Sequence, residues 1–112
     1  MILIATNDLF FRAKIEEVAK QKNVKIYFVE NFDQIIDKDP KILIIDLNFE
    51  DFGPIECIKK LKKFQPHIHI IGYLSHIQTE LKQKSIYAGC DEVMPRSQFS
   101  AKLGDILTKN NL

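Results

Sequence analysis

Short apolar runs rich in isoleucine and valine recur along the chain at near-regular spacing. Runs this short, with so many β-branched side chains, are typical of strands. We expect five strands, at residues 2–5, 24–29, 42–45, 68–74 and 91–94. The unbroken apolar stretches at 42–45 and 70–71 are typical of central strands that are buried on both faces.

The segments between these runs have helical periodicity. Apolar residues three or four positions apart form one stripe in the first segment and one in the last, at Phe11, Ile15, Val18, Ala19, Phe99, Leu103, Ile106 and Leu107. A third helix is expected to begin near Pro54, because a proline lacks only an N–H that the first turn leaves unpaired.

Several residues between the runs are typical of helix ends. We expect Asn7 to cap the first helix, Asn31 the second, and Ser97 or Ser100 the last. Gly89 is expected to end the fourth helix, since glycine is favoured just beyond a helix C-terminus.

Strict alternation of strands and helices favours an α/β fold with a parallel sheet covered on both faces, because each parallel connection crosses over through a helix. The 112 residues suffice for one core and are too few for two. We therefore expect a single domain over residues 1–112, with no output domain.

Charge and composition exclude several classes of protein. Sixteen Lys and Arg nearly balance fifteen Asp and Glu, so no overall field favours nucleic acid or an anionic membrane. No apolar run approaches the ~20 residues that span a bilayer, and no leader segment is evident. Cys57 and Cys90 have no metal-ligand spacing and are expected to be reduced. We expect a cytoplasmic protein without direct nucleic-acid or membrane contact.

Polar residues follow four of the predicted strands, where ligands collect in open parallel sheets. They are Thr6-Asn7-Asp8, Asp46-Leu47-Asn48, Ser75-His76 and Pro95-Arg96-Ser97. An acid, a hydroxyl and a cation are thus expected to face one another. A carboxylate in such a setting is able to accept a phosphoryl group, normally with the help of a metal ion.

The chain resembles, over essentially its whole length, the receiver domain of two-component response regulators. Residues 42–47 look like that family's third strand with the phosphoacceptor Asp46, and 89–92 match its Gly-Ala-x-x segment. Counting onward places Arg96 at the family's lysine, and Ser75 falls at or beside its hydroxyl position. The resemblance implies a flavodoxin-like (βα)5 three-layer sandwich with strand order 2-1-3-4-5.

Departures from the family pattern point to a degenerate receiver. The paired acids that hold Mg²⁺ align with Thr6 and Asn7, and Asp8 restores one ligand only if the register slips by one residue. Arg96 carries a planar guanidinium where the family's lysine carries a compact ammonium. We expect no resident cofactor and no metal site, with weak Mg²⁺ binding at Asp46 and Asp8 as the alternative.

Simple structural roles compete with chemistry at three residues. Asp46 is expected to accept hydrogen bonds and to form an ion pair with Arg96, the alternative being that Arg96 neutralises a phosphoryl group. Ser75 is expected either to cap the fourth helix or to bind a phosphoryl oxygen. The lysines at 59–63 surround the outer face of a core-packed helix. His67, His69 and His76 are expected to be solvent-facing or capping, without a metal.

Three functions remain open. The first, which we favour, is a non-enzymatic receiver-like domain that acts through protein contacts, with a histidine kinase or a downstream regulator as partner. The second is a working receiver phosphorylated at Asp46. The third, a flavodoxin-like cofactor-binding protein, lacks the phosphate-binding glycines after the first strand.

The resemblance further implies a homodimer through the fourth and fifth strand-helix units. Of the aromatic residues near the strand ends, Phe49 and Phe52 are expected to contact partners, because they follow Asp46 in a loop.

Overall fold

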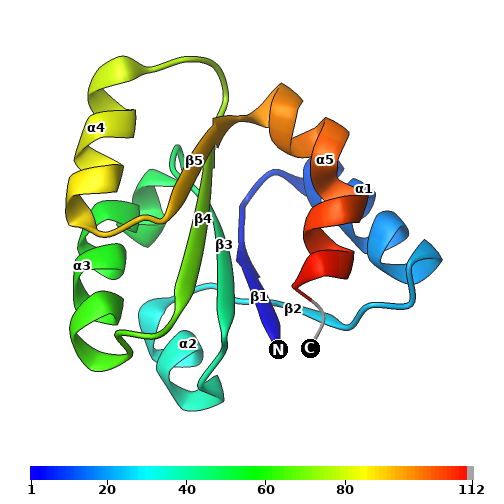
Figure 1. Ribbon diagram of the computed structural model, residues 1–112, viewed down its shortest axis with the longest axis horizontal. Coiled ribbons are helices and arrows are strands. Elements are labelled where there is room, and N and C mark those ends of the chain that lie inside the picture. The colour runs from blue at the N-terminus through cyan, green and yellow to red at the C-terminus, as the bar shows by residue number, and fades with distance from the viewer. Residues whose placement is uncertain (111–112) are drawn as a thin grey trace.

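Five parallel strands form one sheet in the order β2-β1-β3-β4-β5 (Figure 1). The computed structural model describes residues 1–110. The strands are β1 (Ile2–Ala5), β2 (Ile26–Phe28), β3 (Ile42–Asp46), β4 (His69–Leu74) and β5 (Glu92–Pro95). The predicted number, direction and order of strands are confirmed. The second strand is shorter than predicted, since only three of its residues join the sheet.

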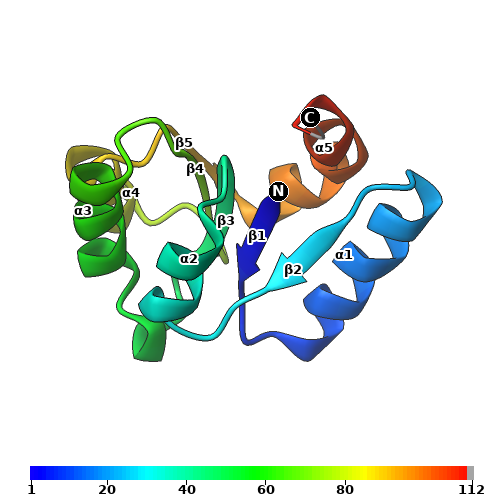
Figure 2. The ribbon, with the colours of Figure 1, turned by 90° about the horizontal axis from the view of Figure 1, so that it is seen from below.

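Helices cover both faces of the sheet and make three layers. They are α1 (Leu9–Gln21), α2 (Phe32–Lys38), α3 (Pro54–Phe64), α4 (Thr79–Ala88) and α5 (Arg96–Lys109), with a short 3-10 turn, η1 (Glu50–Phe52). Figure 2 shows α1 and α5 on one face and α2, α3 and α4 on the other.

Each face of the sheet has its own buried core, because successive side chains of a strand point to opposite faces. Of the predicted central strands, β3 is buried throughout and β4 is buried after its first residue, and β1 is buried throughout as well. Ile4 and Ile44 lie on the α1 and α5 side, and Leu43 and Ile45 lie on the α2, α3 and α4 side. The sheet is thus a rigid frame whose carboxyl edge holds the loops.

Three of the predicted helix ends are confirmed. The Asn31 side chain accepts a hydrogen bond from the N–H of Gln34 at 3.0 Å and caps α2. Pro54 is the first residue of α3. Gly89 follows α4 with φ +121°, a conformation that side-chain-bearing residues rarely adopt.

Two predicted caps are wrong. The cap of α1 is Asp8, whose carboxylate accepts from the N–H of Phe11, while Asn7 lies one residue too early. Helix α5 begins at Arg96, directly after the extended Pro95. Because the helix starts where β5 ends, Ser97 and Ser100 are inside it and neither caps it.

Both cysteines are buried free thiols, as expected. Burial raises the pKa of Cys57 and of Cys90 to about 12. Neither is therefore a reactive thiolate near neutral pH. Within residues 1–110, no helix combines the length and the apolar character needed to cross a membrane.

Candidate receiver-type site

The candidate site lies at the carboxyl edge of the sheet, around the end of β3. Asp46 is the last residue of β3, which lies between β1 and β4 in the sheet. The ends of β1 and β4 therefore flank Asp46 directly. The end of β5 lies one strand further and brings the start of α5 to the same edge (Figure 1).

Asp46 is buried, with 9% of its surface exposed. Its Oδ1 accepts a hydrogen bond from the backbone N–H of Asn48 at 2.9 Å. Burial raises the pKa of Asp46 above its ordinary value, and the Asn48 N–H, the charge of Arg96 and the nearby Thr6 hydroxyl offset this only in part. The site thus makes the charged form of Asp46 less favourable than it is in water.

Asp8 has two structural roles. One carboxylate oxygen accepts from the N–H of Phe11 at 3.1 Å and caps α1, and the other accepts a hydrogen bond from Nη1 of Arg96. The Phe11 N–H and the Arg96 guanidinium together hold the pKa of Asp8 below its ordinary value, against the opposing effect of burial. Asp8 therefore stays ionised and ties the start of α1 to the start of α5.

The predicted ion pair between Arg96 and Asp46 is wrong. Arg96 is bound to Asp8 instead, and its guanidinium carbon lies 5.6 Å from the centre of the Phe11 ring. The reason is geometric: Asp8 is at a helix N-terminus that already favours its charge, so it holds the cation well. Arg96 acts on Asp46 only through space.

The two positions that the resemblance assigns to the acid pair carry no charge. Thr6 is buried, and its hydroxyl accepts from the N–H of Asp8 at 3.3 Å. Asn7 is exposed. Asp8 and Asp46 are therefore the two carboxylates among positions 6, 7, 8 and 46. Asp8 is in an ion pair and Asp46, within the described residues, is not.

These residues do not fit Mg²⁺, which prefers several oxygen ligands in a near-octahedral arrangement. The Asp8 carboxylate is divided between a helix cap and a guanidinium, and one oxygen of Asp46 already accepts an N–H. Among residues 1–110, no three His, Cys, Asp or Glu side chains gather as a metal-binding group.

Ser75 lies beside the site but does not cap α4, so that prediction is wrong. It is exposed, and its backbone N–H donates to Oδ1 of Asn48 at 2.8 Å. Helix α4 begins four residues later, with Gln78 at the cap position. The Asn48 amide also donates to Gln78 at 3.0 Å, so Asn48 joins the loop after Asp46 to the loop before α4.

Tyr73 is a site residue that sequence reasoning missed. It lies opposite Asp46 in the β3–β4 register, is 1% exposed, and stacks on Phe99 at 4.9 Å between ring centres. Its hydroxyl is buried without a hydrogen-bond partner in the described chain. Strand alternation offered the signal, because residues paired across neighbouring strands lie on the same face.

The aromatic residues near the site differ in their exposure to solvent. Phe49 and Phe52 are only partly exposed, pack on each other at 5.4 Å between ring centres, and Phe52 also contacts the core. Phe10, at the start of α1, is 91% exposed, and the neighbouring Leu9 and the loop residue Ile77 are also exposed. These three side chains are more exposed to solvent than Phe49 and Phe52, whose partner contacts stay a prediction.

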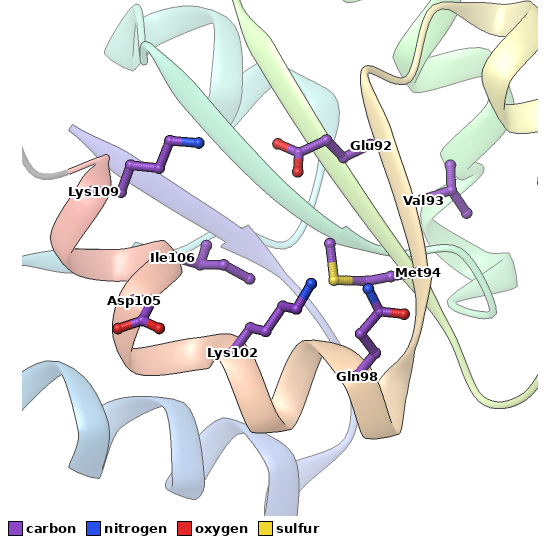
Figure 3. A pocket seen from close by; sticks show the side chains of 8 residues that line it. All are labelled: Glu92, Val93, Met94, Gln98, Lys102, Asp105, Ile106 and Lys109. Atoms are coloured by element: carbon purple, nitrogen blue, oxygen red, sulfur yellow. The ribbon is translucent and has the colours of Figure 1, made fainter.

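The histidines are not part of the site. His67 and His76 are exposed, and His69, at the opposite end of β4, lies 2.6 Å from a carboxylate oxygen of Glu92. A groove of about 470 Å³ between β5 and α5 is also separate, since Asp46 is not among the residues that line it (Figure 3). Its lining mixes both charges with apolar Met94 and Ile106.

Comparison with solved structures identifies the fold. The chain is similar to a response regulator of Hahella chejuensis (TM-score 0.85, 18% identity, 96% of this chain and 91% of the other). It is similar to the NtrX receiver domain of Brucella abortus (TM-score 0.81, 14%, 98% and 97%). A LuxR-family DNA-binding response regulator of Staphylococcus aureus matches comparably (TM-score 0.82, 16%, 99% and 98%).

The chain therefore has the fold of response-regulator receiver domains, as the resemblance implied. Five parallel strands in the order 2-1-3-4-5 with helices on both faces are the shared architecture. No protein-family model and no curated protein sequence matches the chain. At these low identities the likeness concerns the fold, and what the site does must be argued from its own residues.

Proposed function

We propose that this chain is a receiver-like signalling domain that acts through protein contacts without Mg²⁺-dependent phosphorylation of Asp46. The observation that carries the proposal is the Asp8–Arg96 ion pair. In this pair, the acid and the base that lie closest to the positions required for phosphorylation are already bound to each other. The proposal includes no enzymatic activity and no resident cofactor.

The electrostatics of the site support this proposal. A phosphoryl group on Asp46 would carry about −1.5 to −2 charges, and transfer to a carboxylate is normally assisted by a cation. Arg96 is the nearest cation, and its release would leave Asp8 charged without its partner. Burial already disfavours charge at Asp46. Each of these terms opposes the addition of further negative charge.

The exposed apolar residues at the same edge support a role in protein contacts. Leu9 and Phe10 directly follow Asp8, and Ile77 lies in the loop between β4 and α4; all three are exposed. Exposed aromatic side chains such as Phe10 are enriched at interaction surfaces. We propose that a histidine kinase or a downstream regulator contacts this edge, in the cytoplasm.

A homodimer through the fourth and fifth strand-helix units is a further part of the proposal. The groove between β5 and α5 offers both charges for self-complementary contacts (Figure 3). Sedimentation velocity over a range of concentrations tests this part separately.

Intact-protein mass after incubation with acetyl phosphate tests the main proposal. We expect no phosphoryl adduct on the wild-type chain or on Asp46→Asn, with or without Mg²⁺. A Mg²⁺-dependent adduct on the wild-type chain that is absent from Asp46→Asn contradicts the proposal.

The alternative is a working phosphoacceptor, and one observation favours it. Asp46 lies at the carboxyl end of β3, and only its Oδ1 accepts a protein hydrogen bond among the described residues. Its second oxygen is the atom that would attack a phosphodonor. The adduct experiment above decides between the two functions.

A further inference from the structure

A basic groove of about 530 Å³ is lined by residues of α3 and α4. These two helices cover the face of the sheet opposite α5 (Figure 1). Its lining is Glu56, Lys59, Lys60, Lys62, Lys63, Tyr87 and Ala88. Four lysines thus meet one acid in a chain whose net charge is only +1. The groove is a local concentration of positive charge, distinct from the site around Asp46.

Three of these lysines have charges that the protein does little to neutralise. Lys59 is 3.6 Å from the Glu56 carboxylate in an exposed pair, which contributes little. The Lys60 ammonium lies 5.5 Å from the centre of the Phe32 ring of α2, so its charge remains but is directed toward α2. Lys63 is exposed and has no ion pair in the described part of the chain.

The fourth lysine is structural and makes the groove rigid. Nζ of Lys62 is 2.8 Å from both the Asp91 carboxylate and the Ile68 carbonyl oxygen. Its side chain passes so close to Gly89 that an added Cβ would lie 2.6 Å from Cγ of Lys62. The end of α4 is therefore held against α3, and the groove is present before any partner binds.

An aromatic side chain borders the basic residues. Tyr87 is 91% exposed, and Ile86 beside it is 51% exposed. Tyrosine is enriched at interfaces, because it offers a large apolar ring and a polar tip at low entropic cost. Lysines near the end of α3 also interact favourably with the helix dipole, but that effect is confined to the last turn and does not involve Tyr87.

We propose that the α3–α4 groove binds an acidic segment of a partner protein that carries an apolar side chain to pack on Tyr87. Charge complementarity selects an acidic occupant. A nucleic acid fits less well, because its affinity comes from many phosphate contacts, and Lys59, Lys60 and Lys63 without an arginine supply few. This inference names a partner chemistry for the protein contacts proposed above and so rests on that function.

A titration of the full chain tests the inference. The probe is a synthetic peptide of alternating glutamate and serine with one central tryptophan, followed in ¹H–¹⁵N spectra. We expect saturable shifts confined to α3 and α4, with binding that weakens as salt is added. Shifts centred on another surface, or no saturable shift, overturn the inference.

Charge-reversal variants supply matched controls. Lys60→Glu with Lys63→Glu should raise the Kd of the peptide at least about tenfold, since like charges repel across an interface, and Tyr87→Ala should also raise it. Lys20→Glu with Lys25→Glu changes the total charge equally on other exposed positions and should leave the Kd unchanged. Equal weakening by both double variants, or tighter binding of a single-stranded oligonucleotide in this groove, overturns the inference.

The outcome is distinguishable from that of the phosphorylation experiment. If the peptide binds at α3 and α4 while Asp46 becomes phosphorylated, the groove is supported and the proposed function fails. If Asp46 remains unmodified and the peptide does not bind there, the proposed function survives and the inference about this groove fails.

Discussion

Separating the two roles of Asp8 tests how the site is held together. Asp8→Asn keeps a side-chain oxygen for the N–H of Phe11 and removes the charge that pairs with Arg96. Asp8→Ala removes both. Asparagine and aspartate are similarly good helix caps, whereas alanine costs about 1 kcal/mol. The two substitutions therefore divide the contribution of Asp8 into cap and ion pair.

The magnitudes follow from exposure. The Arg96 and Asp8 side chains are 38% and 30% exposed, so solvent screens their attraction and we expect about 0.5–1 kcal/mol from the pair. Asp8→Asn should lower the free energy of unfolding by that amount, and Asp8→Ala by about 1.5–2 kcal/mol in total. A double-mutant cycle of Asp8→Asn with Arg96→Gln should recover a coupling of about 0.5–1 kcal/mol.

Urea unfolding at neutral pH and low salt measures these values, and a pH series checks the sign. The pKa of Asp8 is below its ordinary 3.8 in the folded protein, so its charge stabilises the fold above that pH. The stabilisation is lost as the pH falls through the folded pKa. The difference between wild type and Asp8→Asn should therefore shrink in acid. Zero coupling, with equal costs for Asp8→Asn and Asp8→Ala, refutes the assigned roles.

Three further predictions concern buried groups and α4. Burial raises the pKa of Asp46 in the folded protein, so the stability gained from its protonated form is lost as the pH rises through that pKa. Asp46→Asn should therefore increase the free energy of unfolding in urea at neutral pH by up to about 1 kcal/mol. A lower free energy of unfolding contradicts this. Tyr73→Phe removes a buried hydroxyl without a protein partner, and should raise the thermal midpoint or leave it unchanged; a marked fall would show that the hydroxyl is bonded. Gly89→Ala should cost about 1–3 kcal/mol in the same unfolding assay, because φ is +121° and Lys62 occupies the space, and an unchanged value contradicts the packing assigned to Lys62.

The hydrophobic pattern predicts the fold well, because it reports burial directly. The continuous run at 42–45 is typical of a strand covered on both faces, and its alternation with helical segments favours that assignment. Helix ends are less predictable where neighbouring residues are equally suited. Asn7 and Asp8 are both good caps, and only the path of the chain out of β1 selects Asp8.

The sequence predicts which residues lie at the site, but not which of them form ion pairs with one another. Sequence position brings Asp8, Asp46 and Arg96 to one edge of the sheet, but the choice of partner for Arg96 depends on distances of a few ångströms between loops. The start of α5 directly after Pro95 sets where the guanidinium points. Local sequence carries no signal for that choice.

A Mg²⁺ titration of the wild-type chain tests directly whether the site around Asp46 binds the metal ion that phosphorylation would require. The amide signals of Thr6, Asn7 and Asn48, around Asp46, are followed in ¹H–¹⁵N spectra up to millimolar metal. We expect no saturable shift, because Arg96 already holds the Asp8 carboxylate and positions 6 and 7 carry no acid. A saturable shift centred on these amides, abolished by Asp46→Asn, would contradict it and restore a metal-dependent receiver site.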